Sequence, residues 1–118
     1  MLVEPYKSEI LPHWRYKNAE AAEKSAAAIY EMFEAWRAED DFVGMDMARK
    51  FIQMGYTRAR RYANYKGGKK YTEDGSTHPR GNDPVKAAAA AVFKTWWERI
   101  RADDDYLRRK REHQSKYG

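Results

Sequence analysis

The chain has 118 residues and a mass of 13.9 kDa, which is enough for one domain with a single core and too little for two. Hydrophobic residues make up 42% of it and include 4 Trp, 9 Tyr and 4 Phe, which argues against wholesale disorder. It has no cysteine, so disulfides, thiolate chemistry and cysteine-ligated metals are excluded. It also lacks a run of about 18 apolar residues, so we expect a cytoplasmic protein without a membrane partner.

The net charge of +5 is unevenly distributed along the chain. Residues 1–48 hold 5 basic and 10 acidic side chains, a net charge of −5. Residues 49–80 hold 9 basic and 2 acidic ones, a net charge of +7, and residues 81–118 hold 9 and 6, a net charge of +3. A central basic block of this kind either contacts a polyanion or solvates one face of a domain.

Residues 1–17 are expected to form an extended arm rather than a helix, because Pro5 and Pro12 interrupt them. Trp14 and Tyr16 alternate and would point to the same side of such an arm. We interpret this pair as a strap that packs the arm onto a helical body, with stacking on a ligand as the alternative.

Residues 19–38 are predicted to form an amphipathic helix that begins after the N-cap Asn18. The apolar stripe of this helix consists of Ala22, Ala26, Ile29, Phe33 and Trp36. Its other face is acidic and carries Glu20, Glu23, Glu31 and Glu34.

A second helix is predicted from about residue 45 to 65, after a break at residues 40–44. Its apolar stripe consists of Ala48, Phe51, Ile52, Gly55, Ala59 and Tyr62. Glycine in the middle of a helix costs about 1 kcal/mol relative to alanine. We therefore expect another helix to cross close to Gly55.

The opposite face of this second helix is basic. An arc of about 120° holds Arg49, Lys50, Gln53, Thr57, Arg60, Arg61 and Asn64. Between residues 49 and 64 no carboxylate lies in this arc, and the acids nearest to these residues in sequence are Asp46 and Glu73. We therefore expect few pairs at i, i+4 to neutralise the arginines.

Residues 66–82 are rich in turn formers and lack an apolar period, so they are predicted to form a long, flexible, basic loop. A third helix is predicted over residues 83–101, with Asp83 as its N-cap and Pro84 at its first position. Its predicted buried stripe consists of Ala89, Val92, Phe93, Trp96 and Ile100.

A short basic helix is predicted over residues 106–113, after a break at the three aspartates of residues 103–105. We interpret these aspartates as a cap and as partners of Arg108 and Arg109, because the spacing of a calcium loop is absent. The whole chain, residues 1–118, is thus predicted to be a single all-α domain. It would be a small bundle of three main helices plus a short C-terminal helix, with an extended N-terminal arm and a long basic loop.

The sequence offers no pattern typical of catalysis. His13, His78 and His113 are far apart and have no second metal ligand at helical spacing. No serine lies in a nucleophile elbow, and the run of residues 67–70 lacks the spacing of a P-loop. We therefore expect a protein that is not an enzyme and that holds no metal or other cofactor.

The basic helix, the glycine–lysine run and the nearby tyrosines together predict a surface that binds DNA or RNA. Arginine suits phosphate oxygens, amide side chains can bond base edges, and tyrosines can stack on unpaired bases. The predicted site consists of Arg49, Lys50, Gln53, Arg60, Arg61, Asn64, Tyr65, Lys66, Lys69, Lys70 and Tyr71. Phosphate contacts would dominate, with little sequence preference.

Two alternatives remain open at this point. In one, Arg49, Arg60 and Arg61 pair within the protein with the acidic first helix, whose partners would be the six acids between Glu31 and Asp46. In the other, the protein is a protein-interaction or virion-associated structural component that docks a partner through Trp-rich helical surfaces. Trp97, next to Trp96 of the stripe, would favour this second alternative if it were exposed.

The run of residues 42–71, with residues 25–30 before it and the helix that begins at Asp83-Pro84 after it, resembles a small domain-of-unknown-function family of bacteria and tailed phages. The resemblance covers residues 13–113 and implies no activity and no functional residue. It implies a bacterial or phage-encoded protein, and hence the cytoplasm of a bacterial or phage-infected cell.

Overall fold

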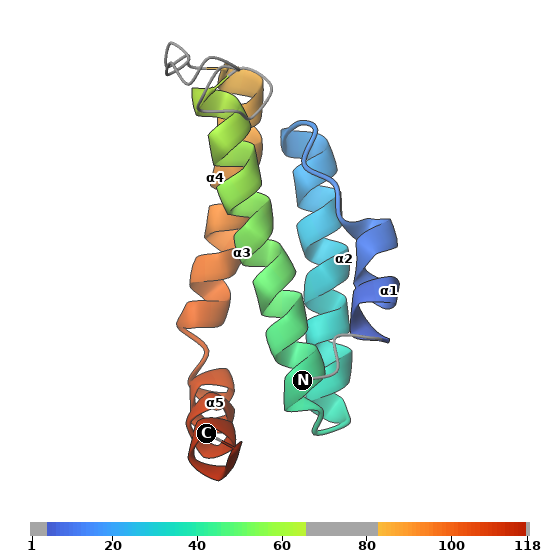
Figure 1. The fold of residues 1–118 in the computed structure, drawn as a ribbon. Coiled ribbons are helices and arrows are strands. Elements are labelled where there is room, and N and C mark those ends of the chain that lie inside the picture. Colours follow the sequence, from blue (N-terminus) through green and yellow to red (C-terminus); the bar gives the residue numbers. More distant parts are fainter. Residues whose placement is uncertain (1–4, 66–82, 118) are drawn as a thin grey trace, which may run out of the picture.

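The computed structural model describes residues 5–65 and 83–117, and this part of the chain contains helices and no strand. The elements in chain order are α1 (Tyr6–Ile10), η1 (Leu11–His13), α2 (Ala19–Ala38), α3 (Phe42–Asn64), α4 (Pro84–Arg101) and α5 (Asp104–Tyr117). The three long helices α2, α3 and α4 form an elongated bundle (Figure 1). Helix α1 packs against α3 and places Tyr6 against Trp36 of α2, and α5 extends the bundle at the end where α2 is followed by α3 (Figure 1). The predicted small all-α bundle is confirmed.

Residues 6–13 form two short helices rather than part of an extended arm, which corrects the prediction for these residues, whereas residues 14–17 are not helical. Pro5 is the N-cap of α1, and Pro12 lies in the first turn of η1. At the start of a helix the backbone N–H groups have no carbonyl partner within the helix, so proline costs no hydrogen bond there. The two prolines therefore mark the starts of short helices instead of preventing them. The predicted strap is present, because Trp14 packs edge-on against Phe51 at 5.3 Å and its Nε1 donates to the Phe51 carbonyl at 2.9 Å.

The bounds of α2 agree with the prediction, and the Asn18 side chain caps it by accepting a hydrogen bond from the Ala21 N–H at 2.8 Å. Helix α3 begins three residues earlier than predicted, because the Asp41 carboxylate accepts from the Gly44 N–H at 3.0 Å and caps the helix there. Asp40 turns the chain between the two helices with a φ of 55°.

The α5 helix is longer than the predicted range of residues 106–113, since it spans Asp104–Tyr117. Asp103 caps it by accepting from the Tyr106 N–H at 2.9 Å, so the interpretation of the aspartates as a cap is confirmed. The side chain of Tyr106 is the buried anchor of this otherwise polar helix, with 2% of its surface exposed.

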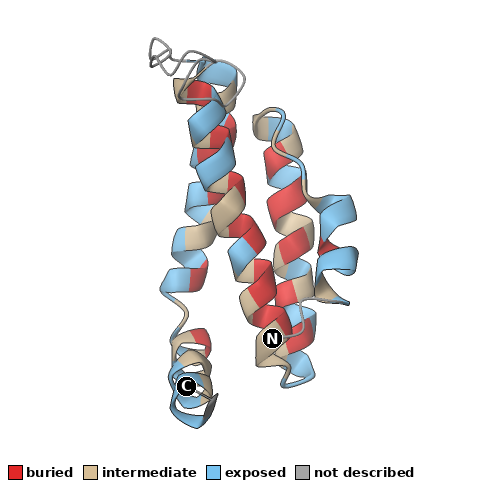
Figure 2. Ribbon diagram, viewed as in Figure 1, coloured by how far each residue is buried: buried red, intermediate tan, exposed pale blue. Residues whose placement is uncertain are grey.

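The core lies between α2, α3 and α4, whose inward faces are buried along their whole length (Figure 2). Its largest fully buried side chains include Ile29 and Phe33 of α2, Ile52 of α3 and Phe93 of α4. The predicted crossing at Gly55 is confirmed, because a Cβ atom there would lie 2.7 Å from the Phe93 ring.

Three residues of the predicted stripes are less buried than expected. Val92 and Trp96 are half-buried at the edge of the core, and Tyr62 keeps 36% of its surface exposed. These residues lie at the margins of their helical faces, where periodicity alone does not decide burial. No helix in the described ranges combines the length and the apolar character that crossing a bilayer requires.

Candidate nucleic-acid interface

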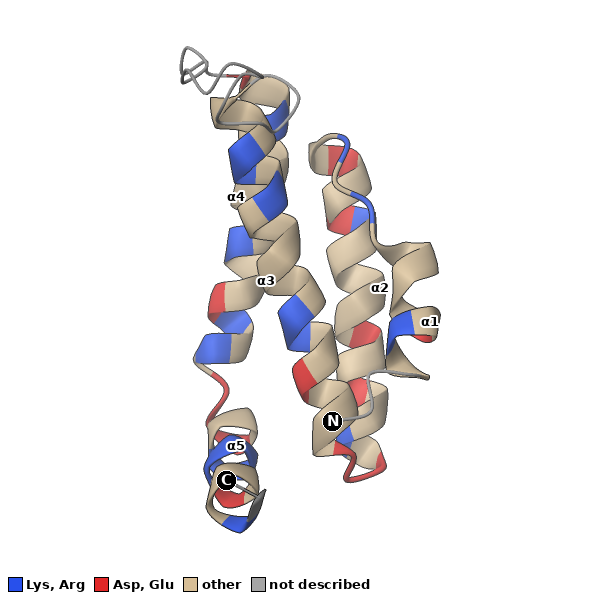
Figure 3. Cartoon of the chain, viewed as in Figure 1, with Lys and Arg blue, Asp and Glu red and all other residues tan. Residues whose placement is uncertain are grey.

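The outward face of α3 carries a line of exposed residues. Lys50, Thr57 and Arg61 are all exposed and fall within about 40° of one another at 100° per residue. Arg58, which is also exposed, lies about 60° further round, toward the N-terminal segment. We call these four residues the basic ridge, and Figure 3 shows the basic positions along α3.

Arg49 and Gln53 of the predicted site are already engaged within the protein. Arg49 donates to the Asp46 carboxylate, at 2.9 Å from Nη2, and to the Gln53 side-chain oxygen, at 2.7 Å from Nη1. The buried Tyr106 hydroxyl donates to the same Asp46 oxygen at 2.6 Å. Burial lowers the pKa of Arg49, but Asp46 and Tyr106 together raise it above its ordinary value, so the guanidinium stays charged. This group ties α3 to α5.

The remaining predicted residues divide into a local pair and a set that lies outside the described residues. Arg60 donates to the Asn64 side-chain oxygen at 3.0 Å, and both are half-buried beside the ridge. Tyr65 is the half-buried C-cap of α3. The other predicted site residues, which lie outside the described ranges, are Lys66, Lys69, Lys70 and Tyr71. The loop predicted over residues 66–82 also lies there.

The first alternative above holds in part, because Arg49 pairs with Asp46, one of the six acids that it named, whereas Arg60 and Arg61 form no ion pair with a described carboxylate. In the described part of the chain, the ion pair made by an α3 cation is that of Arg49 with Asp46 on the same helix. The acids of α2 have other partners: Glu34 pairs with Arg37, and Glu23 accepts from the Trp96 indole at 3.3 Å. The exposed cations of the ridge therefore face solvent without a carboxylate partner among these residues.

An aromatic and basic groove lies beside the ridge, and sequence reasoning missed it. It is a depression of about 440 Å³ lined by Trp14, Arg15, Tyr16, Lys17, Tyr62 and Lys86. Among the described residues, three cations and three aromatic rings line it, and no carboxylate does. Helical periodicity assigned Tyr62 to the core stripe and so concealed it. The alternation of basic and aromatic residues over residues 14–17 was the available signal.

The tryptophans of α4 are not free docking surfaces. Trp97 is half-buried, stacks against Tyr56 at 5.9 Å and has the Arg101 guanidinium 4.8 Å from its ring centre. Trp96 is also half-buried, and the Arg99 guanidinium lies 5.3 Å from its ring. An exposed Trp97 would have favoured a protein partner, but the Trp97 side chain is half-buried.

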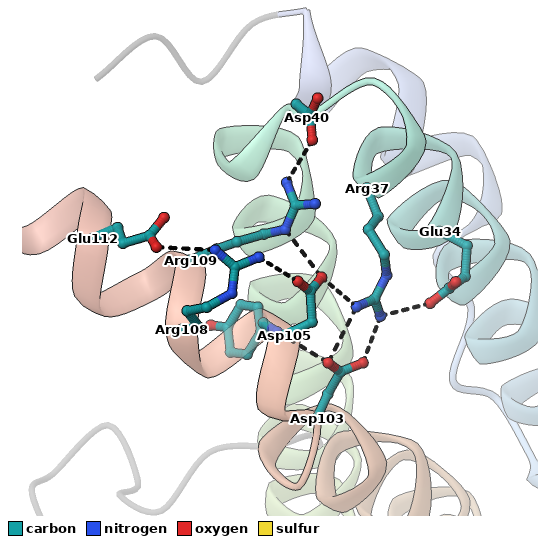
Figure 4. Close-up of polar contacts among 9 residues, drawn as sticks. Glu34, Arg37, Asp40, Asp103, Asp105, Arg108, Arg109 and Glu112 are labelled. Carbon is teal, nitrogen blue, oxygen red and sulfur yellow. Dashed lines mark hydrogen bonds and ion pairs between the residues drawn. The ribbon is translucent and has the colours of Figure 1, made fainter.

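A second charged region lies at the other end of the bundle, where α2, the α2–α3 turn and α5 meet (Figure 4). Arg37 reaches the Asp103 carboxylate at 2.5 Å, that of Asp105 at 2.7 Å and that of Glu34 at 2.8 Å. Arg109 joins Asp105 at 3.0 Å to Asp40 at 3.1 Å. We call this group, together with Arg108 and Glu112, the aspartate–arginine network.

The network shifts the pKa values of its carboxyl groups. Hydrogen bonds from Arg108 and Arg37 lower the pKa of Asp105 to about 2. The hydrogen bond from Arg37 lowers the pKa of Asp103 as well, although burial of that carboxyl opposes the shift. These carboxylates are therefore held ionised as partners of arginines. In the described ranges no group of three or more His, Asp or Glu side chains is placed to hold a metal ion.

Comparison with known proteins places the chain in a family without assigning it an activity. Searches of curated proteins and of solved structures found no match. A family model described as a domain of unknown function, DUF4385, matches residues 1–116, more than the range over which the resemblance was noted. The chain therefore belongs to the DUF4385 family.

Proposed function

We propose that this protein binds DNA or RNA through the basic ridge of α3, by contacts to phosphates with little sequence preference and without catalysing a reaction. The observation that carries the proposal is that no carboxylate among the described residues pairs with Lys50, Arg58 or Arg61, although four other described arginines form ion pairs. Exposed cations without an internal partner keep their full charge available to a polyanion.

The dimensions of the ridge suit a nucleic-acid backbone. Lys50 and Arg61 are 11 residues apart on one line of the helix, which corresponds to about 16 Å along its axis. Their long side chains can reach several phosphates on either side of that line, and Arg60 at its margin adds a further donor. As the family resemblance implies, we place this activity in the cytoplasm of a bacterial or phage-infected cell.

The proposal predicts a measurable dependence on salt. If three or four cations contact phosphates, log affinity should fall against log salt with a slope of about −3 on duplex DNA. Affinity near physiological salt should then be modest, about micromolar. Fluorescence anisotropy with labelled oligonucleotides from about 50 to 200 mM salt measures both quantities.

A matched pair of variants assigns the binding to the ridge. The double change Lys50→Ala and Arg61→Ala should reduce the slope by about 2 and weaken all sequences alike. The control changes Lys94→Ala and Arg111→Ala remove the same charge from exposed positions on α4 and α5. Alanine favours a helix at each position, so folding should be retained. Absence of binding at 50 mM salt, or equal effects of the two pairs, would refute the proposal.

A further inference from the structure

We infer that the groove of Trp14, Tyr16 and Tyr62, with Arg15, Lys17 and Lys86 around it, receives an unpaired base, so that the ligand is a single-stranded nucleic acid. This inference rests on the proposed function, which by itself does not distinguish single strands from duplexes. It depends on residues that the ridge does not include.

The aromatic side chains form a continuous wall of the groove. The Tyr16 and Tyr62 rings lie 6.1 Å apart with an angle of 32° between their planes, and Trp14 meets Tyr16 edge-on at 5.1 Å. Trp14 is fixed from behind by Phe51, while Tyr62 remains 36% exposed. Base stacking needs rings of this kind, held in place on one side and open on the other.

The cations around the wall are placed to hold the backbone of the same strand. The Lys86 ammonium lies 5.8 Å from the centre of the Tyr62 ring and donates to the Lys17 carbonyl at 3.0 Å. Arg15 and Lys17 are exposed at the rim of the groove. Because the described lining carries three cations and no carboxylate, it attracts a phosphate.

The groove is continuous with the ridge. Arg58 of the ridge has its guanidinium 5.5 Å from the centre of the Trp14 ring, and Arg61 directly precedes Tyr62 in α3. A strand that contacts the ridge phosphates can therefore place a neighbouring base against Tyr62. In a duplex the base faces are already covered by their neighbours, so only an unpaired base can use this wall.

Substitution of Tyr62 tests the inference directly. Tyr62→Ala should weaken binding to an oligothymidine single strand by roughly 10-fold, because one base loses its stacking partner. The same change should leave the affinity for a blunt-ended DNA duplex of two separate strands unchanged, since the ridge phosphate contacts remain. Tyr62→Phe keeps the ring and should retain single-strand affinity. A urea titration of each variant verifies that the fold is intact.

Photochemical cross-linking locates the base independently of affinity. An oligonucleotide that contains 5-iodouracil should cross-link to the peptides that carry Tyr62, Tyr16 or Trp14, as identified by mass spectrometry. Cross-links confined to other peptides, or equal single-strand affinities of Tyr62→Ala and Tyr62→Phe, would contradict the inference that the groove receives a base. Neither result would contradict binding to the ridge. Failure of the wild-type chain to bind single strands and duplexes alike at 50 mM salt would remove the proposed function itself.

Discussion

The aspartate–arginine network and the basic ridge use the same kind of side chain in opposite ways. In the network, Arg37 and Arg109 are surrounded by carboxylates that come from the α2–α3 turn and from the start of α5. On the ridge, Arg58 and Arg61 have no carboxylate beside them in the described residues. The comparison teaches that an arginine's role here is set by its tertiary neighbours.

Because the network is more buried than the ridge, its charged side chains should contribute more to the free energy of unfolding. The Arg37 side chain is 21% exposed, and its guanidinium lies 5.1 Å from the centre of the Phe33 ring. Ion pairs in such a setting are screened less by water than those at an open surface. The ridge cations are exposed and form no ion pair with a described carboxylate, so their removal should barely affect folding.

The largest expected effect comes from removing the centre of the network. Arg37→Met keeps the apolar stem but leaves the carboxylates of Asp103 and Asp105 without a shared partner. We expect a loss of about 2 to 3 kcal/mol in the free energy of unfolding, somewhat below the value for a fully buried pair. Urea unfolding followed by circular dichroism measures this loss.

The control for that prediction is the same change on the ridge. Arg61→Met removes an exposed charge from α3 and should change the free energy of unfolding by no more than about 0.5 kcal/mol. Equal losses from the two variants would show that the contrast between the regions is wrong.

A smaller effect is expected from the group of Asp46, Arg49 and Tyr106, which joins α3 to α5. Tyr106→Phe removes the hydroxyl that donates to Asp46 at 2.6 Å, in a side chain that is 2% exposed. The loss should be about 1 to 1.5 kcal/mol, because Arg49 continues to satisfy that carboxylate. Tyr30→Phe changes a half-buried tyrosine outside this group and serves as the comparison.

Lowering the pH should reduce the stabilisation that the network gives to the folded state. The folded-state pKa of Asp105 is lowered to about 2 and that of Asp103 is lowered too, so the stabilisation is complete above the ordinary carboxyl pKa of 3.8. It is lost as the pH falls from about 4 toward 2, since the unfolded state takes up protons first. The stability difference between the wild type and Arg37→Met should therefore shrink over that range. A difference that is constant with pH would contradict this account.

The smallest change in stability is expected from adding a carboxylate partner for an arginine of the basic ridge. Thr57→Glu places a carboxylate four residues before Arg61, which should stabilise α3 by about 0.3 to 0.5 kcal/mol. The same change should weaken binding to oligonucleotides, because the new charge repels phosphates. Thr57→Gln is the neutral control. A variant that is more stable and binds as tightly as the wild type would break the link between unpaired charge and function.

The elements of this fold were predictable where their signals lie within one segment. Asn18 and the stripe of residues 22–36 place α2 correctly, and Asp83-Pro84 does the same for α4. Helix α1 was missed because a proline can either begin a helix or interrupt one, and the sequence pattern alone does not distinguish these two roles.

The groove and the network were less accessible to sequence reasoning. The Asp105–Arg109 pair follows from i, i+4 spacing, but Arg37 and Asp103 are 66 residues apart, and only the packing of α5 against the α2–α3 turn joins them. Likewise Tyr62 and Lys86 meet Tyr16 only once three separate segments have assembled. The basic face of α3 could be predicted because helical geometry alone groups its residues, and its binding to nucleic acid stays a prediction.

The way in which α5 is held has a consequence for motion. Among its side chains of described burial, Tyr106 is the buried one, and its other attachments are largely hydrogen bonds and ion pairs. Such a helix can detach while α2, α3 and α4 stay packed, because little apolar surface is exposed by its release. Its amide protons should therefore exchange with deuterium earlier than those of the central helices. Added salt should accelerate the exchange by screening the pairs that hold it.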